Sequence, residues 1–78
     1  MVVYVLKSVK DTKRYVGMSA DSRKRLVQHN RGEVDSTKNR RPFELLYEEK
    51  VGSRHEARKR EKYLKSAAGR RYLKKLGI

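Results

Sequence analysis

The sequence predicts an α+β fold, a small three-stranded antiparallel sheet flanked by helices in the order β-β-α-β-α-α. Two short runs rich in β-branched and aromatic residues, 2–6 and 14–18, are joined by a polar segment, as in a β-hairpin. A third run of this kind follows at 43–51, and helix-capping signals precede the remaining stretches. With 78 residues, of which 36% are hydrophobic, we expect a single domain over residues 1–78 with a thin core.

The expected hairpin pairs Val2–Leu6 with Arg14–Met18 and brings two tyrosines together. Side chains alternate between the two faces of a strand, so Tyr4 lies on one face of the first strand. Tyr15 begins the second strand and, with symmetric pairing, lies opposite the region of Tyr4. Two phenols can then converge on one spot. The alternative is that both are ordinary strand tyrosines, because Tyr is favoured in sheets.

The first helix is expected to start with Ser19 or Asp21 as its N-cap and to end near Asn30, just before a glycine. Arg25 and His29 lie four residues apart in it and therefore share a helix face. They are candidates for a site. The plainer interpretation is that Arg25 belongs to a solvated stripe, as expected for the two cations that precede it.

The segment 32–41 is polar and is expected to form a loop with a basic tip before the third strand, 43–51. Lys38, Arg40 and Arg41 lie at this tip. A run of charges is usually only solvated. On so basic a chain, these three side chains are also candidates for phosphate contacts at the rim of a nucleic-acid site.

A capping box opens the longest helix, with Ser53 as N-cap and Glu56 three residues later. The expected helix spans 54–66. Gly69 is then expected to interrupt the chain before a short terminal helix at 70–76.

One carboxylate, Glu61, falls on the apolar stripe of this longest helix. Ala57, Glu61 and Leu64 follow one another at spacings of four and three residues. Burial of an unpaired carboxylate costs several kcal/mol, so an inward-facing Glu61 requires a cation or hydrogen-bond donors. The alternative is an exposed Glu61–Lys65 pair, which contributes only a few tenths of a kcal/mol.

The charge balance indicates a polyanionic partner. The chain has 22 Lys and Arg against 9 Asp and Glu, a net charge of +13 with His neutral. Nucleic acid is the commonest partner of such a chain. An anionic membrane is disfavoured because no amphipathic helix has a large enough apolar face. Without cysteine, disulfides and thiolate metal sites are excluded. The chain enters a strand at once, without a signal peptide, so we expect a soluble cytoplasmic protein.

Val2-Val3-Tyr4 and Tyr15-Val16-Gly17 stand where one known family, the GIY-YIG endonuclease domain, has its two defining tripeptides. The separation of the two motifs is also what this family has, although the first lacks Gly and Ile. The block 21–32 resembles the family's next motif, with its Arg at Arg25 and its His at His29. The tail 65–71 is similar to small bacterial members named after the excinuclease C subunit. The resemblance continues at Thr37, Arg41-Pro42, Leu46-Tyr47, Ala57, Arg60-Glu61 and Leu64-Lys65.

This resemblance implies hydrolysis of nucleic-acid phosphodiester bonds with one divalent metal ion, Mg²⁺ or Mn²⁺, held by Glu61. DNA is the expected substrate, in repair or recombination. Arg25 would donate to the phosphate. Tyr4 resembles the family's general base or water-positioning group, with Tyr15 assisting, and His29 could relay the proton or orient the phosphate. A free phenol has a pKa of about 10, so nearby cations must lower the pKa of Tyr4 if it is to act as a base.

A basic DNA- or RNA-binding module without catalysis is the main alternative, and composition alone favours it. Glu61 discriminates between the two, because phosphate binding gains nothing from a buried carboxylate. An adaptor for membrane surfaces or acidic proteins is a third class, for which no binding face is evident.

Overall fold

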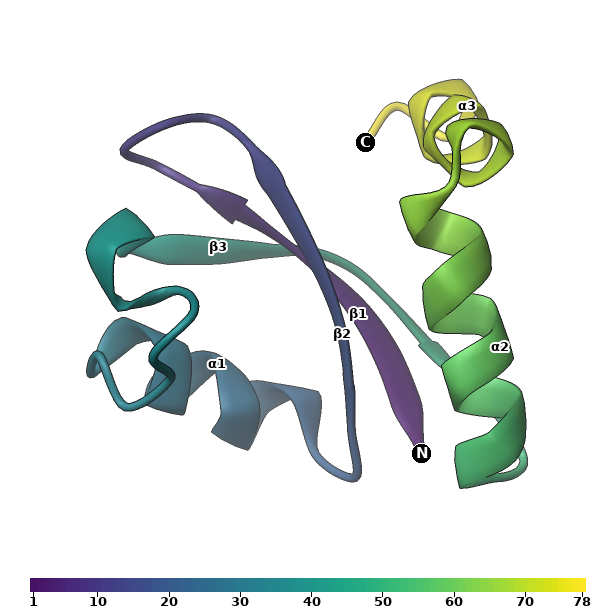
Figure 1. Ribbon diagram of the computed structural model, residues 1–78, viewed down its shortest axis with the longest axis horizontal. Coiled ribbons are helices and arrows are strands. Elements are labelled where there is room, and N and C mark those ends of the chain that lie inside the picture. The colour runs from purple at the N-terminus through teal and green to yellow at the C-terminus, as the bar shows by residue number, and fades with distance from the viewer.

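The computed structural model describes residues 1–78 and contains one three-stranded antiparallel sheet with three α-helices (Figure 1). The strands are β1 (Val2–Ser8), β2 (Arg14–Ser19) and β3 (Phe43–Lys50), in the order β2-β1-β3. The helices are α1 (Ser22–Asn30), α2 (Arg54–Lys65) and α3 (Ala67–Lys75), and a 3₁₀ turn, Lys38–Arg40, precedes β3. The α+β fold and the order β-β-α-β-α-α are confirmed. None of the helices has the length and apolarity needed to span a bilayer.

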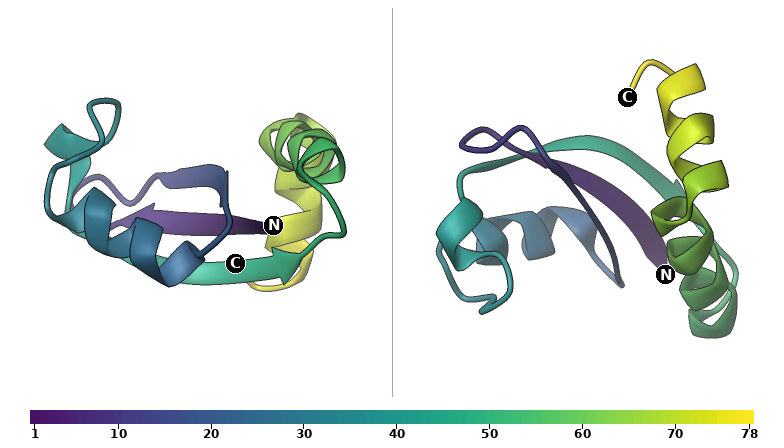
Figure 2. Two further views of the ribbon diagram at one scale, coloured as in Figure 1. Left: turned by 90° about the horizontal axis from the view of Figure 1, so that it is seen from below. Right: turned by 45° about the horizontal axis from the view of Figure 1, so that its top comes forward.

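Alternation along β1 divides the core into two layers. Tyr4 and Leu6 point to one face of the sheet, where they pack with Phe43 beneath α1. Val3 and Val5 point to the other face, which α2 and α3 cover. Figure 2 shows α1 and the α2–α3 pair on opposite sides of the twisted sheet. The second layer is completed by Val16, Ala57, Leu64 and Leu73.

A bulge in β3 allows this strand to contribute side chains to both layers of the core. Val5 pairs with Tyr47 and the next residue, Leu6, pairs with Leu45, so Leu46 is the extra residue. Without the bulge, Leu45 and Tyr47 would share one face. With it, Leu45 packs in the layer under α1 and Tyr47 packs in the layer under α2.

In the hairpin, Tyr4 and Tyr15 do not pair directly with each other. Tyr4 lies opposite Gly17, and Tyr15 lies opposite Leu6. Residues paired across antiparallel strands point to the same face, so both phenols still lie on the side of α1. The prediction that Tyr15 lies near Tyr4 is therefore confirmed, with the two residues in diagonal positions.

Polar side chains fix α1 at both ends. Asp21 is its N-cap, one of the two residues expected for this role. Ser22, buried in the first turn, donates a hydrogen bond to Glu48 of β3. At the other end, the Asn30 amide accepts from the Phe43 backbone N–H at 2.7 Å and donates to the Phe43 carbonyl at 3.2 Å. These contacts hold a helix with few apolar residues in place.

The expected break at Gly69 is wrong. Ser66 ends α2 and also caps α3, since its hydroxyl oxygen accepts from the Gly69 N–H at 3.2 Å. The terminal helix therefore starts at Ala67, and Gly69 lies inside it. A Cβ on Gly69 would collide with the Tyr63 carbonyl oxygen and lie 2.5 Å from the Leu64 Cα. The glycine is thus needed for close approach of the two helices, and it does not end either of them.

Candidate active site

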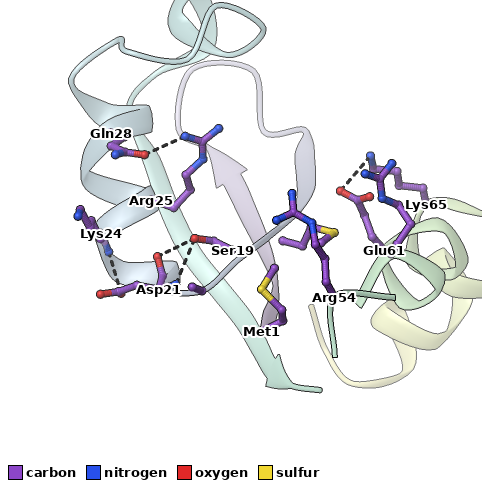
Figure 3. A pocket seen from close by; sticks show the side chains of 12 residues that line it. Met1, Ser19, Asp21, Lys24, Arg25, Gln28, Arg54, Glu61 and Lys65 are labelled. Atoms are coloured by element: carbon purple, nitrogen blue, oxygen red, sulfur yellow. Dashed lines mark hydrogen bonds and ion pairs between the residues drawn. The ribbon is translucent and has the colours of Figure 1, made fainter. Parts of the chain in front are cut away.

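Side chains from the two faces of the sheet meet around its open edge at β2. A cavity of about 810 Å³ lies there, between α1 and α2. In Figure 3, Arg25 of α1 and Arg54 and Glu61 of α2 project toward this space. Five cations but only two carboxylates, Asp21 and Glu61, line it. The remaining lining residues are Met1, Met18, Ser19, Ala20, Lys24, Gln28, Arg58 and Lys65. The excess of cations suits an anionic ligand.

Glu61 combines features of both sequence interpretations. Its side chain is only 16% exposed, and its stripe neighbours Ala57 and Leu64 are buried. Its carboxylate also lies 3.6 Å from the Lys65 Nζ, whose side chain is 53% exposed. Glu61 is therefore a largely covered carboxylate that faces the cavity and has one exposed cationic neighbour.

The phenol of Tyr4 lies directly over Gly17 of the neighbouring strand. A Cβ on Gly17 would lie 2.6 Å from the Tyr4 oxygen and 3.1 Å from a ring carbon of Tyr15. The absence of a side chain at Gly17 therefore lets Tyr4, which belongs to the central strand, extend toward the β2 edge and the cavity.

His29 forms the centre of a buried polar cluster. Its imidazole is fully buried, with Nε2 3.2 Å from the Tyr4 oxygen and Nδ1 2.7 Å from the Thr37 Oγ1. The rings of Tyr4, Tyr15 and Phe43 surround it in edge-to-face geometry at centroid distances of 6.1, 5.0 and 5.8 Å. Both ring nitrogens thus have a partner, and the orientation of the ring is fixed.

Burial shifts both members of the Tyr4–His29 pair toward their neutral forms. It raises the pKa of Tyr4 to about 12, with Tyr15 acting in the same direction and Arg25 opposing. Burial, followed by the charge of Arg25, lowers the pKa of His29 to about 4. The condition stated for Tyr4 to act as a base, a pKa lowered by nearby cations, is therefore not met in the protein alone, because burial outweighs the effect of Arg25.

The site residues expected from sequence fall into two groups. Arg25 and Glu61 line the cavity, and Tyr4, Tyr15 and His29 form the aromatic cluster beside it. A hydrogen bond within α1 holds the side chain of Arg25: its Nη1 donates to the Gln28 side-chain oxygen at 2.8 Å.

The three expected rim cations, Lys38, Arg40 and Arg41, lie elsewhere, beside the C-terminal end of α1, and none of them lines the cavity. The Arg40 Nε pairs with the Asp11 Oδ2 at 2.9 Å, and its guanidinium lies over the Phe43 ring. Arg40 thus ties the loop to the hairpin turn, whereas Lys38 and Arg41 are exposed.

Sequence reasoning missed two kinds of residue in this region. Arg54, Arg58 and Lys65 line the cavity with Glu61, and their spacing of four, three and four residues on one helix was a usable signal. Thr37, which holds the imidazole of His29, was noted only as a position of the family resemblance, because the polar composition of its loop gives no sign of burial.

The donor set of the cavity fits one hard divalent cation. No group of three or more His, Cys, Asp or Glu side chains could hold a metal ion by itself. Of the two carboxylates in the cavity, Asp21 already accepts the N–H of Lys24 as helix cap, which leaves Glu61. Mg²⁺ usually binds through one or two carboxylates, substrate phosphate oxygens and retained waters, so a single Glu61 is a sufficient protein ligand.

Comparison with known proteins identifies the family of the chain. The family described as the GIY-YIG catalytic domain matches residues 1–75. The UPF0213 proteins SSP2268 of Staphylococcus saprophyticus and SERP0126 of Staphylococcus epidermidis are each 38% identical over 73 residues, covering 92% of this chain and 88% of the relative. UPF0213 protein SAV0488 of Staphylococcus aureus is 40% identical over 65 residues, covering 82% and 78%. No solved structure matches significantly. The chain belongs to the GIY-YIG catalytic domain family, a family of nucleases that are generally dependent on divalent metal ions.

Proposed function

We propose that the protein is a metal-dependent endonuclease that hydrolyses phosphodiester bonds, with DNA as its substrate. One observation carries the proposal: Arg25 and Glu61, from helices on opposite faces of the sheet, line one cation-rich cavity beside a buried Tyr4–His29 pair. Phosphate binding alone requires neither the covered carboxylate nor the hydrogen-bonded pair. The resemblance of the tail 65–71 to excinuclease-C-like proteins supports a role in repair or recombination.

The cations of the cavity bind and orient the substrate. The guanidinium of Arg25 donates to non-bridging oxygens of the scissile phosphate, where negative charge develops during the displacement. Arg54 and Arg58, on the opposite wall, contact neighbouring phosphates. Their positive charge attracts the strand into the cavity.

Glu61 would hold the divalent cation, Mg²⁺ or Mn²⁺, because it is the one carboxylate of the cavity that does not cap a helix. When bound, such an ion supplies positive charge that polarises the scissile phosphate. The pairing of Glu61 with the exposed Lys65 is of the weak surface kind, so it would compete little with a divalent cation for this carboxylate.

Tyr4 and His29 move the proton of the attacking water. The phenol of Tyr4 is protonated and the imidazole of His29 is neutral at pH 7. If Thr37 donates to the Val34 carbonyl, 3.4 Å away, it accepts from Nδ1–H of His29, and the Nε2 is then free to accept from Tyr4. The Tyr4 oxygen takes a proton from water while its own proton passes to Nε2. The resulting hydroxide attacks phosphorus as the P–O bond to the ester oxygen breaks. The leaving oxygen takes a proton from solvent, and Nε2 returns its proton to solvent through Tyr4.

In this relay the final proton acceptor, the buried imidazole of His29, is a weak base with a pKa of about 4. The step therefore depends on the positive charge that a bound divalent cation would supply to make the attacking water more acidic. Tyr4 never has to exist as a free phenolate, because a proton leaves its oxygen as another arrives. Tyr15 packs its ring against His29 and so keeps the imidazole aligned.

A basic binding module without catalysis is the second candidate, and the net charge of +13 favours it. Both candidates bind nucleic acid in EDTA. Only the nuclease cleaves it when a divalent cation is added.

Purified protein is incubated with labelled branched, duplex and single-stranded DNA and with RNA, in Mg²⁺, Mn²⁺ or EDTA. We expect cleavage of a DNA substrate in the presence of metal and none in EDTA. Glu61→Gln keeps the shape of the side chain but removes the charge that a hard cation requires, so it should abolish cleavage and leave binding intact.

Glu44→Gln is the matched control, since Glu44 is an exposed carboxylate on β3 outside the cavity. It should cleave like the wild type. Full cleavage by Glu61→Gln would exclude Glu61 as the metal ligand. Binding by the wild type without cleavage of any substrate would favour the second candidate.

A further inference from the structure

A second cavity of about 650 Å³ opens at the other end of strand β2, between the hairpin and the α2–α3 junction. We call it the distal groove. Four cations line it, namely Lys13, Arg14, Lys65 and Arg70, above a floor that includes Leu64 and Leu73. No carboxylate lines it, whereas two line the cavity at the candidate active site. The charged side chains that line it are therefore all positive, which suits an anionic ligand.

Two of these cations have neither an ion-pair partner nor a side-chain hydrogen bond to the protein. Lys13 and Arg70 take part in none of the four ion pairs of the molecule. By contrast, Arg14 donates to the backbone carbonyl oxygen of Ile78, and Lys65 lies beside Glu61. Lys13 comes from the hairpin and Arg70 from α3, so the fold brings together two uncompensated charges that are far apart in the sequence.

The distal groove continues the active-site cavity along one edge of the sheet. Lys65 lines both, and β2 runs from the groove at Arg14 to the cavity at Ser19. Five residue steps of an extended strand span about 17 Å. One strand of a DNA duplex advances 3.4 Å per nucleotide, so this length corresponds to about five nucleotides.

We propose that the distal groove binds the phosphate backbone of the nucleic-acid strand about five nucleotides to one side of the scissile phosphate, with Lys13 and Arg70 as its main contacts. This inference rests on the proposed nuclease function, because it places the groove relative to the point of cleavage. The groove makes the substrate footprint asymmetric. Beyond the opposite end of the cavity, at the start of α1, a hollow of about 390 Å³ has two cations, Arg23 and Lys50, offset by three carboxylates, Asp21, Glu48 and Glu49.

The test compares the double variant Lys13→Gln/Arg70→Gln with the matched control Lys59→Gln/Lys62→Gln. The control removes the same charge from exposed positions on α2 that line no cavity. Binding to a 20-nucleotide DNA, single-stranded or duplex, is measured in EDTA at several salt concentrations. Two lost phosphate contacts should reduce the log–log salt slope by about 1.4 for single strands and about 1.8 for duplex. The control should keep the wild-type slope.

Equal slopes for the groove variant and the control would overturn the inference. Should the double variant fail to fold, Arg70→Gln alone is tested. It should reduce the salt slope by half as much as the double variant, and an unchanged slope would count equally against the groove. This binding arm does not depend on cleavage. Absence of cleavage by every protein would therefore refute the nuclease while the slopes still decide whether the groove contacts DNA.

A second arm locates the groove relative to the cut. Substrates are shortened stepwise on either side of the mapped cleavage position. For the wild type, KM should rise when one side, and only one, falls below about five nucleotides. The groove variant should be insensitive to shortening on that side. Equal sensitivity on both sides, or the same loss in variant and wild type, would contradict the proposed strand path.

Discussion

The phenol of Tyr4 lies over Gly17, and this contact connects the two motifs of the hairpin at the level of single atoms. Tyr4 belongs to the central strand, whereas Arg25 and Glu61 line a cavity at the sheet edge. Only a residue without a side chain, placed opposite Tyr4 on the edge strand, allows the phenol to extend in that direction. Sequence reasoning identified Gly17 as part of a motif but did not give it this role, because the role depends on the register.

Replacement of Gly17 by Ala should therefore impair catalysis more than folding. The new Cβ would lie 2.6 Å from the Tyr4 oxygen, so the phenol has to move away from His29. We expect the cleavage rate to fall at least about tenfold, since a displaced acid–base group loses part of the 10²–10⁴ that it can supply. The measurement is the single-turnover rate. Gly52→Ala, with only the Glu56 carboxylate at 3.3 Å from its new Cβ, is the control and should retain the wild-type rate.

Burial of His29 should make stability depend on pH. Its folded-state pKa of about 4 lies below the ordinary value of 6.5, so between these values the unfolded chain binds a proton that the folded protein does not. The stability contributed by neutral His29 is complete above about pH 6.5 and is lost as the pH falls. Between pH 7 and pH 5 the free energy of unfolding should decrease by about 2 kcal/mol.

Urea unfolding of wild type, His29→Gln and His55→Gln at pH 7 and pH 5 measures this effect. His29→Gln should lose most of the pH dependence. His55→Gln removes the exposed histidine and should retain it. Equal pH dependence in all three proteins would show that His29 titrates normally in the folded state.

At the scale of elements, Arg60 fixes the two C-terminal helices on the sheet. Its Nε pairs with the Glu49 Oε1 of β3 at 2.5 Å. Its guanidinium lies 5.0 Å from the ring centre of Tyr63 on α2 and 4.9 Å from that of Tyr72 on α3. Because Arg60 precedes Glu61 directly, this packing also sets the rotation of α2 that turns Glu61 toward the cavity.

The close approach of α2 and α3 predicts that a larger residue at Gly69 destabilises the protein. Helix propensity alone would make Gly69→Ala stabilising by up to about 1 kcal/mol. The new methyl group would instead collide with the backbone of α2. Overpacking of this kind typically costs about 1–3 kcal/mol, so the midpoint of thermal unfolding should fall. A raised midpoint would show that the two helices separate easily. The neighbouring Ala68, exposed on α3, gives a control as Ala68→Ser.

The elements themselves could largely be predicted from local patterns. Alternation identified the strands, and the side-chain caps Asp21 and Ser53 marked the starts of α1 and α2. The bulge at Leu46 could not be predicted, because three consecutive apolar residues do not reveal which one is extra. Gly69 was misread for a related reason: a glycine required for close packing looks the same in sequence as a glycine that ends a helix.

At the scale of the whole molecule, the candidate site forms because α1 and α2, on opposite faces of the sheet, both contribute side chains to a cavity at the edge strand β2. Sequence spacing placed Arg25 and His29 on one helix face and Glu61 on an apolar stripe, which was enough to name the candidates. It could not tell that His29 is fully buried while Arg25 lines a cavity. Nor could it separate the cations of the site from Arg40, whose charge is compensated by Asp11. Both distinctions depend on contacts distant in sequence.

The central claim is that Tyr4 transfers the proton of the attacking water, and Tyr4→Phe tests it most directly. The substitution removes one oxygen and keeps the ring. Tyr47→Phe is its matched control, since Tyr47 also lies on the sheet and donates its phenolic hydrogen bond to Glu49, but on the opposite face.

The measurement is the single-turnover cleavage rate of both variants in saturating Mg²⁺, with thermal unfolding of each to verify the fold. Tyr4→Phe should lower the rate by about 10²–10⁴ while its loss of a hydrogen bond costs only about 1 kcal/mol of stability. Tyr47→Phe should cleave at the wild-type rate. A folded Tyr4→Phe protein that cleaves as fast as the wild type would contradict the claim and leave Tyr4 as a core strand residue.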